Sequence, residues 1–390
     1  MKKIAILGST GSIGSTTLKI VRKNKKNFKV QLLSTNSNVK KIFKQAKEFK
    51  VKNVIILDKK KIKLWKSQFK KNNIKIYDNF EISKKNFNNK LDFVMNGISG
   101  IEGLEPTLKI IKHTKKIGIA NKESIICGWN LIKKELAKNK TEFIPVDSEH
   151  FSIYKLVQDQ KFETISKVII TASGGPFLNK KNFKKKIKIS EALNHPNWKM
   201  GKKISIDSST MMNKIFEVIE AKKIFNLNIK KIDILINPNS YIHAIIVLKD
   251  GTIKFLAHET KMDIPIFNSI YESSSQNYYN NEKLNLIKIN KINLSKPNIK
   301  TFNSLKILKS IPATDSLFET ILITANDQLV DMFLNEQIEF KKITYYLQKI
   351  INFKIFKKYC KITPKSVDQI YKVRNLVKKF VYNYVNKIND

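Results

Sequence analysis

Two carboxylates, Asp147 and Glu149, directly follow an expected strand over Phe143–Val146. On an extended segment residues i and i+2 point to the same side, so these two side chains should share a face. With a third carboxylate from elsewhere they would offer an all-oxygen site, which suits Mg²⁺ or Mn²⁺. The alternative is a solvated strand end that caps the following helix. By itself the pattern fits a metal site that needs one more ligand and a capping strand end equally well.

The segment from Asp207 to Glu217 supplies a third carboxylate. Its Asp, Ser and Thr residues at 207–210 precede a helical run and are expected to form the N-cap of that helix. Asn213 and Glu217 are four residues apart and Lys214 and Glu217 three apart, so all three share one helix face. A metal ligand, a cation and an amide donor together suit a phosphorylated, metal-bound substrate. The alternative for Lys214 and Glu217 is an ordinary surface pair.

A glycine-rich turn, GSTGSIG at Gly8–Gly14, follows an expected strand over Ile4–Leu7 and precedes an expected helix over Ser15–Val21. Glycines at such a junction permit a tight turn and let backbone N–H groups approach a pyrophosphate at the helix N-terminus. The spacing is GxxGxxG, whereas the usual fingerprint is GxGxxG, but the flanking strand and helix support the same interpretation. The alternative is a glycine-rich turn with no ligand.

The end of the second expected strand, Val30–Leu33, favours NADP(H) over NAD(H). An NAD site places Asp or Glu there to hold the ribose 2′-hydroxyl, and that carboxylate would repel a 2′-phosphate. Here the segment 34–38 reads Ser-Thr-Asn-Ser-Asn, and Lys40 and Lys41 follow. Because no acid is present and two cations follow, the expected cofactor is NADPH.

Three further segments place polar groups at strand ends or in a loop. In TASGGPF at 171–177, Ser173 and two glycines are suited to form an anion nest. The run HPNWKMG at 195–201, after a polar stretch at 179–190, is typical of a mobile flap. There His195 is placed to contact phosphate, although a lone histidine is more often structural. Lys122 follows a strand of the first domain and either polarises a substrate oxygen or is one more surface lysine.

These groups need a scaffold, and the spacing of apolar residues predicts an α/β fold for the first 147 residues. Short apolar runs alternate there with amphipathic stretches, which favours a mostly parallel sheet with helices on both faces. The expected strands are Ile4–Leu7, Val30–Leu33, Val54–Leu57, Phe93–Met95, Ile117–Ala120 and Phe143–Val146.

A second unit and a helical tail are expected after residue 147. Asp250-Gly251 predicts a hairpin, and the composition from about Tyr271 to Lys300 suits a linker. All 12 glycines lie at or before Gly251, and the tail carries apolar residues at helical spacing. The expected strands of the second unit are Val168–Ala172, Ile204–Ile206, Ile232–Ile236, Ile242–Leu248 and Thr252–Ala257, and the helical positions of the tail include Val367, Ile370, Tyr371, Val377, Phe380, Tyr384 and Ile388.

The charge of the chain first suggests a nucleic-acid partner. Lys and Arg number 74 against 32 Asp and Glu, so the formal net charge is +42 over 390 residues. Only Arg22 and Arg374 are arginines, however, and proteins that read phosphates and bases rely on the bidentate fork of Arg. The lysines are spread from end to end, as an A/T-rich genome would produce. We therefore expect no specific nucleic-acid partner.

Cysteine count and hydropathy indicate a soluble protein of a reducing compartment. Cys127 and Cys360 are too few for a disulfide framework and lack metal-ligand spacing. The apolar run after the initial Met-Lys-Lys stops at Gly8, short of a signal peptide, and no stretch reaches the ~18–20 apolar residues of a membrane span. The expected location is cytoplasmic, with no membrane partner.

Taken together, the motifs resemble those of the 1-deoxy-D-xylulose 5-phosphate reductoisomerase family, NADPH-dependent enzymes of the non-mevalonate pathway to isoprenoid precursors. In the tail, Ala325-Asn326-Asp327 is similar to a family Ala-Asn-Glu. The main shared motifs, in the family's order and with similar spacing, are GSTGSIG at 8–14, ANKES at 120–124, PVDSEH at 145–150, SGGPF at 173–177, HPNW at 195–198, and IDSSTMMNK at 206–214 followed by Glu217.

The resemblance implies a homodimer whose chains have four parts. These are an N-terminal Rossmann-type dinucleotide-binding domain (1–147), a central α+β catalytic domain with a flap (148–271), a linker (272–300) and a C-terminal helical bundle (301–390). It implies a reaction in two stages, in which a metal-assisted rearrangement of the carbon skeleton, by retro-aldol cleavage and re-addition, gives a branched aldehyde phosphate. NADPH then reduces that aldehyde to 2-C-methyl-D-erythritol 4-phosphate.

The resemblance also implies the roles of single residues. The divalent metal, Mg²⁺ or Mn²⁺, would be held by Asp147, Glu149 and Glu217, with Lys122 beside the reacting oxygens and Trp198 covering the substrate from the flap. The sugar phosphate would be bound by Lys122, Ser148, Glu149, Ser173, His195, Ser208, Asn213, Lys214 and Glu217. The NADPH site would be lined by Thr10, Gly11, Ser12, Ile13, Asn38, Asn121, Glu123 and Gly201.

Some positions depart from the family pattern. Asn36 and Ser37 stand where the family usually has Gly and Lys, which removes a partner of the 2′-phosphate; Lys40 or Lys41 would have to substitute. Ile215 replaces a usual Gly within the helix that carries Glu217. The rival interpretations are another metal-assisted NAD(P)-dependent oxidoreductase acting on a phosphorylated substrate and a basic nucleic-acid-binding protein.

Overall fold

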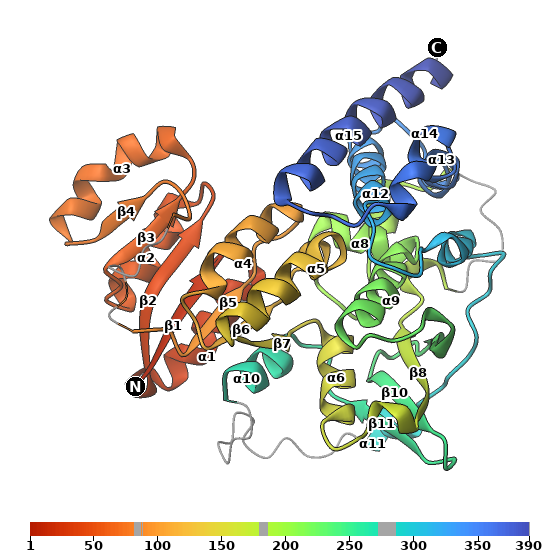
Figure 1. The fold of residues 1–390 in the computed structure, drawn as a ribbon, viewed down its shortest axis with the longest axis horizontal. Helices are drawn as coiled ribbons and strands as arrows, with labels where there is room; N and C mark the ends of the chain where they lie inside the picture. Colours follow the sequence, from red (N-terminus) through yellow and green to blue (C-terminus); the bar gives the residue numbers. More distant parts are fainter. Residues whose placement is uncertain (82–86, 88, 179–185, 272–285, 390) are drawn as a thin grey trace. The chain divides into compact units, whose positions relative to one another are not determined.

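The computed structural model describes residues 1–81, 87, 89–178, 186–271 and 286–389, and the chain forms two compact units (Figure 1). Unit 1 comprises Met1–Ser124, Leu131–Phe151 and Met262–Glu282, and unit 2 comprises Ile125–Asn130, Ser152–Lys261 and Lys283–Asp390. The four-part division at residues 147, 271 and 300 stays a prediction. Residues 272–285 of the predicted linker and residues 179–185 before the predicted flap lie outside the described residues.

Unit 1 is built on a seven-stranded parallel sheet in the order β4-β3-β2-β1-β5-β6-β7. The six predicted strands are confirmed, whereas β4 was missed because its residues, Lys-Ile-Tyr, form no apolar run. The strands are β1 (Lys2–Leu7), β2 (Phe28–Thr35), β3 (Asn53–Ile56), β4 (Lys75–Tyr77), β5 (Phe93–Asn96), β6 (Lys116–Ile119) and β7 (Glu142–Pro145).

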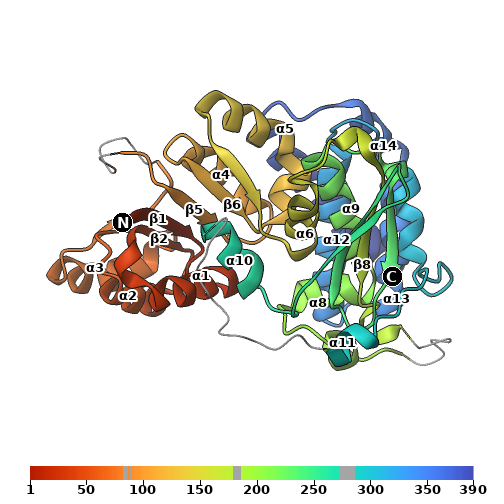
Figure 2. The same ribbon diagram turned by 90° about the horizontal axis from the view of Figure 1, so that it is seen from below.

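Helices cover both faces of this sheet, because the strand order runs outward from β1 in two directions and right-handed crossovers then fall on opposite faces. Figure 2 shows α1 (Ser12–Lys23), α2 (Val39–Glu48) and α3 (Lys59–Lys71) on one side and α4 (Leu104–Ile111) and α5 (Lys122–Asn139) on the other. A late helix, α10 (Asp263–Tyr271), packs on α1 and joins the same buried core.

Unit 2 contains a four-stranded sheet in the order β11-β10-β8-β9. Its strands are β8 (Ile165–Ala172), β9 (Ile232–Ile236), β10 (Ile242–Leu248) and β11 (Ile253–Ala257), and only β8 and β9 run parallel. The predicted hairpin at Asp250-Gly251 is confirmed, with Gly251 at φ +89° between β10 and β11. The core of the sheet includes residues of two helices, α6 (Ser148–Val157) and α9 (Met212–Ile224).

The predicted helical C-terminal region is confirmed. It consists of α12 (Phe318–Leu334), α13 (Phe340–Ile351), α14 (Lys354–Lys357) and α15 (Val367–Asn389), and it follows the short α11 (Leu286–Asn290). The largely buried α12 contacts α13, α15 and α8 (Lys202–Ser209). Across the described residues, no helix is long and apolar enough to cross a membrane.

The predicted strand at Ile204–Ile206 is wrong, because these residues lie in α8, which follows α7 (Ile189–Leu193). A three-residue Ile-Ser-Ile alternation fits a strand as well as a helix turn, and the contacts with Gly201 decide between them. The backbone N–H and the hydroxyl of Ser205 both donate to the Gly201 carbonyl, at 3.1 and 3.0 Å. That local bonding closes the first turn of a helix.

The predicted N-cap at residues 207–210 is also wrong. Helix α8 continues through Ser209, and α9 starts only at Met212, after a turn in which Met211 has φ +63°. The hydroxyls of Ser209 and Thr210 donate back to the Ile206 carbonyl, so they complete α8 instead of capping α9. The segment therefore forms a helix–turn–helix corner, which we call the α8–α9 corner (residues 207–217).

Candidate active site

The glycine-rich turn lies between β1 and α1, as predicted, and close backbone packing requires two of its glycines, Gly8 and Gly14. Gly8 has φ +73°, and a Cβ atom on Gly14 would lie 2.4 Å from the Gly8 carbonyl oxygen. Thr10, Gly11, Ser12 and Ile13 form the turn and the first turn of α1, whose N-cap Gly11 has no side chain to bond the helix amides. Such a helix start is suited to receive an anion.

Lys41 connects α2 to this turn by hydrogen bonds that the sequence did not predict. Its Nζ donates to the Thr10 carbonyl at 2.9 Å and to the Ser15 hydroxyl at 2.8 Å. Asn38 caps α2 by accepting from the Lys41 backbone N–H at 3.2 Å, and the Thr10 and Thr35 hydroxyls lie 2.7 Å apart. Lys40, by contrast, is exposed. Of the two candidate cations, Lys41 is therefore the one held at the turn.

Asn121 is buried and holds the start of α5 against the loop after β5. Its Oδ1 accepts from the Ser124 N–H at 2.6 Å, and its Nδ2 donates to the carbonyls of Ile98 and Gly100. The predicted cofactor residues Asn121 and Glu123 thus flank Lys122 at the N-terminus of α5, near the carboxyl end of β6.

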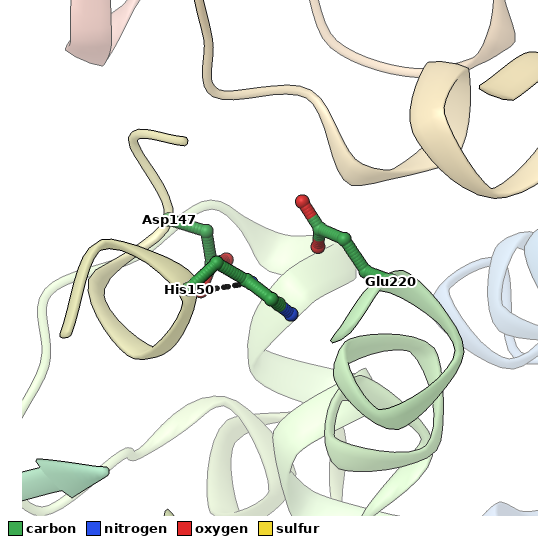
Figure 3. Close-up of side chains that lie close together, drawn as sticks. All are labelled: Asp147, His150 and Glu220. Atoms are coloured by element: carbon green, nitrogen blue, oxygen red, sulfur yellow. Dashed lines mark hydrogen bonds and ion pairs between the residues drawn. The ribbon is translucent and has the colours of Figure 1, made fainter. Parts of the chain in front are cut away.

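Lys122 and Asp147 form a buried ion pair at the ends of β6 and β7. Lys122 Nζ lies 3.0 Å from Asp147 Oδ2, and the two side chains are only 9% and 13% exposed. The other oxygen of Asp147 is 3.3 Å from Nδ1 of the fully buried His150 (Figure 3). Burial by itself raises the pKa of Asp147, but the Lys122 ammonium and the His150 hydrogen bond hold that pKa well below its usual range. The carboxylate is therefore kept ionised.

The predicted extended arrangement of Asp147 and Glu149 is wrong, because α6 begins at Ser148. Asp147 precedes the helix, its carbonyl accepts from the Phe151 N–H at 2.8 Å, and its Oδ1 accepts from the Glu149 N–H at 3.3 Å. Ser148 donates to Glu149 Oε2 at 2.6 Å. The two acids are therefore placed by a strand end and a first helix turn, and Asp147 bonds the start of α6 as the capping alternative expects.

On α9, Glu217 is nearly inaccessible to solvent, at 2% exposed, and carries two partners on the predicted face. Asn213 Nδ2 donates to Glu217 Oε1 at 2.5 Å, and the Lys214 ammonium forms an ion pair with Oε2. Lys214 is itself only 4% exposed. The alternative of a surface helix pair is therefore excluded.

Ser173 and His195 are hydrogen-bonded to each other. Ser173 Oγ lies 3.0 Å from His195 Nε2, and His195 Nδ1 accepts from the backbone N–H groups of Asn197 and Trp198 at 3.1 and 3.0 Å. Because Nδ1 accepts, the proton of the neutral ring is on Nε2. Burial lowers the pKa of His195 to about 4.

Trp198 and Gly201 are the other two predicted site residues of the flap segment, and the structure describes both. The Trp198 ring packs edge-on against His243 with centroids 6.2 Å apart, and Asn197 Nδ2 donates to the Pro238 carbonyl at 2.6 Å. Gly201 is exposed, and a Cβ atom there would meet no atom within 4 Å, so it leaves open space at the start of α8.

Two buried groups near the α8–α9 corner were missed by sequence reasoning. Asp207 was interpreted as a cap, and Asn326 only as part of a family-like tripeptide, yet Asn326 Nδ2 donates to Asp207 Oδ1 at 2.7 Å. They are 119 residues apart, so no local pattern could have paired them. His150 was also missed; its signal was the i, i+3 spacing from Asp147, which becomes visible only once α6 is assigned.

Lowering the pH should weaken the fold through His195. Its folded pKa of about 4 lies below the usual 6.5, so the unfolded chain binds a proton first and stability falls as the pH drops from 6.5 toward 4. We expect the free energy of unfolding of the His195→Asn variant to fall less steeply over this range than that of the wild type. Urea unfolding at several pH values measures both slopes, and equal slopes would contradict the assignment of a neutral His195.

Models of known protein families match the chain in three segments. Residues 4–128 match the family described as 1-deoxy-D-xylulose 5-phosphate reductoisomerase, residues 143–225 match its C-terminal domain, and residues 258–380 match a further DXP reductoisomerase C-terminal domain. A 1-deoxy-D-xylulose 5-phosphate reductoisomerase of Pelagibacter ubique is 52% identical over 381 residues, which cover 97% of this chain and 98% of that protein. One from Clostridium tetani is 36% identical over 99% of this chain and all of its own length.

Solved structures agree with these matches. A DOX-P reductoisomerase in complex with NADPH, fosmidomycin and magnesium superposes with a TM-score of 0.90 at 29% identity, over all of both chains. The enzyme from Zymomonas mobilis in complex with NADPH gives a TM-score of 0.87 at 28% identity, over 98% of this chain and 99% of that one. The predicted fold class and the motif resemblance are both confirmed. The chain belongs to the 1-deoxy-D-xylulose 5-phosphate reductoisomerase family.

Proposed function

We propose that the residues assembled above carry out the family's reaction, the rearrangement and reduction of 1-deoxy-D-xylulose 5-phosphate to 2-C-methyl-D-erythritol 4-phosphate for isoprenoid precursors. The predicted enzyme class, an NADPH-dependent reductoisomerase, is confirmed by the family models and the curated relatives. The predicted cofactors, NADPH and a divalent metal, are confirmed by solved relatives that hold NADPH and magnesium. The observation that carries the residue assignment is the buried acid and ammonium on α9, Glu217 and Lys214, with the amide of the half-buried Asn213 beside them.

The donor chemistry fits a hard divalent cation. The proposed ligands are Asp147 and Glu149 in unit 1 and Glu217 in unit 2, all carboxylates, which Mg²⁺ and Mn²⁺ prefer. Asp147 is kept ionised by Lys122 and His150, and Glu217 is buried beside Lys214. When bound, the metal supplies Lewis-acid polarisation of the substrate's ketone and adjacent hydroxyl oxygens.

The remaining residues bind and orient the sugar phosphate. Lys122 offers an ammonium at the carboxyl ends of the unit 1 strands, where substrates of such sheets bind, and it is proposed to stabilise charge that develops on the reacting oxygens. The phosphate and hydroxyls of the substrate are proposed to contact Ser148 in unit 1 and five residues of unit 2, which are Ser173, His195, Ser208, Asn213 and Lys214. Trp198 is proposed to cover the substrate and exclude water from the intermediate aldehyde.

The glycine-rich turn fits the pyrophosphate of NADPH, because its glycines let backbone segments pack closely. A Cβ atom at Gly8 would collide with the backbone of the loop after β5, and one at Gly14 with the backbone of the turn itself. The proposed lining of the cofactor site is Thr10, Gly11, Ser12, Ile13, Asn38, Asn121, Glu123 and Gly201. In this chain Asn36 and Ser37 offer no cation, and Lys41 is the ammonium held beside the turn. We propose that Lys41 supports NADPH binding.

We also propose that the chain acts in the cytoplasm as a homodimer, without a specific nucleic-acid partner. The strand β11 is at the edge of its sheet, and its Ile253 and Phe255 side chains are 61% and 54% exposed. An open edge with apolar side chains tends to pair with another chain. The proposed occupant of that edge is a second copy of this chain.

The test of the function is NADPH oxidation that depends on 1-deoxy-D-xylulose 5-phosphate and Mg²⁺ or Mn²⁺, with the product identified. No turnover with this substrate would end the proposal.

Asp147→Asn and Glu217→Gln should each reduce turnover by about a thousandfold or more, since each removes a metal ligand, while NADPH still binds. Chelation of the metal should have the same effect. The control is Asp233→Asn, which breaks a surface pair with Lys167 and should leave turnover unchanged; near-normal turnover in either ligand variant would mean that the metal site is misassigned.

Lys41→Gln should weaken NADPH binding by about tenfold, because it removes two hydrogen bonds from an ammonium to the turn. The measurement is the Kd from the fluorescence of bound NADPH, without substrate. Lys40→Gln is the matched control, because it removes the same charge one residue away from an exposed side chain. Equal effects of the two variants would show that only net charge matters and that the contacts of Lys41 do not.

Light scattering should give twice the mass of one chain for the wild type. A lysine at Phe255 places a charge on the proposed pairing edge, so Phe255→Lys should shift the mass toward one chain. Leu64→Lys is the control, since Leu64 is 76% exposed on α3. A wild-type mass of one chain at micromolar concentration would refute the dimer.

A further inference from the structure

The carboxylate of Asp207 is buried one residue before Ser208, a proposed substrate ligand. Asn326 Nδ2 donates to Asp207 Oδ1 at 2.7 Å, and Lys203 Nζ lies 3.0 Å from Asp207 Oδ2. The Asp207 side chain is 2% exposed and Asn326 is fully buried. Both carboxylate oxygens are therefore used, one by a residue of α8 itself and one by α12.

Lys203 joins three helices at this point. Besides Asp207 on α8, its ammonium lies 3.0 Å from Asp327 Oδ1 on α12. It also lies 5.4 Å from the ring centroid of Phe216 on α9, the residue directly before Glu217. The ammonium of Lys203, the carboxylate of Asp207 and the amide of Asn326 together connect α12 to both sides of the α8–α9 corner.

The corner depends on such outside contacts. Between its helices Met211 has φ +63°, a left-handed conformation that is costly for a residue with a side chain and persists only when the surroundings impose it. Ser208 lies before this turn, and Asn213 and Lys214 lie after it. A small change at the turn would move these proposed ligands relative to one another, and misplacement by about 1 Å costs catalysis heavily.

Stability alone does not explain the amide of Asn326. Its Oδ1 is buried, and none of the described residues donates a hydrogen bond to it. A buried polar atom without a partner costs free energy that an apolar side chain of similar size would avoid. What the amide provides instead is a directed N–H bond to Asp207.

We propose that Asn326 is a positioning residue of the active site, which acts through Asp207 to hold the α8–α9 corner in the geometry that binds the substrate. The helical C-terminal region thereby contributes to substrate binding without contacting the substrate. The inference rests on the proposed function, because Ser208, Asn213 and Lys214 are substrate ligands only there.

Asn326→Leu removes the donated bond with little change in volume. The KM for 1-deoxy-D-xylulose 5-phosphate should rise by about tenfold, as expected for the loss of a hydrogen bond to a charged group. The Kd of NADPH, whose proposed turn is in unit 1, should stay within about twofold of the wild type. An unchanged KM in the folded variant overturns the proposal.

The double variant Asp207→Asn with Asn326→Asp exchanges donor and acceptor and keeps the net charge. It should bring the KM back to within about threefold of the wild type, because an amide again donates to a carboxylate. If it folds with a wild-type Tm but keeps a KM raised tenfold, the directed bond is not what matters. This variant also decides the question alone if Asn326→Leu folds too poorly to assay.

Glu319→Gln is the matched control for general loosening of α12. Glu319 is fully buried two turns earlier on the same helix, where Lys223 Nζ lies 3.0 Å from its Oε1. The variant should lower the Tm at least as much as Asn326→Leu and leave the KM unchanged. If Glu319→Gln raised the KM as much as Asn326→Leu does, only the packing of α12 would be involved and the positioning role would be refuted.

Absence of turnover in the wild type would instead refute the proposed function. The failure of the positioning role and the failure of the function are therefore distinguishable.

Discussion

Charge burial is the constraint on which the rest of this structure depends. Glu217 and Lys214 are both withdrawn from water on α9, and each is tolerated there only because the other is present. Removing one partner of such a pair costs about 3–5 kcal/mol, whereas an apolar pair of the same size would often be no less stable. A folded chain gains little from carrying these groups, which supports the proposal that they bind a ligand.

The same constraint recurs in other parts of the two units. Lys122 is buried against Asp147, and Lys223 is buried against Asp315 and Glu319. Most of the 72 lysines are exposed and carry no such information, which is why a net charge of +42 was a poor guide to function. What distinguishes these three lysines from the background is an acidic partner together with burial, and a composition shows neither.

Sequence reasoning was most reliable where the signal was local and strongly periodic. Six of the seven strands of the parallel sheet, the glycine-rich turn, the β10–β11 hairpin and the C-terminal helices were predicted. It was wrong at Ile204–Ile206, at the cap assigned to residues 207–210 and at the extended segment around Glu149, all of which lie at helix starts or ends near the site. At such places two or three residues fit the helical and the strand periodicity equally well. Which structure forms depends on hydrogen bonds such as those that Ser205 donates to the Gly201 carbonyl. The pairing of Asp207 with Asn326 was beyond reach because it joins distant segments.

The bonding of Ser173 determines what kind of ligand atom it can meet. Its oxygen receives the His195 Nε2–H at 3.0 Å and the Gly175 N–H at 3.1 Å, so both of its lone pairs are taken. The hydroxyl proton is then the only group left to offer, and it requires an acceptor. Ser173 can therefore donate a hydrogen bond to an acceptor such as a phosphate oxygen, but it has no lone pair left to accept one from an ammonium.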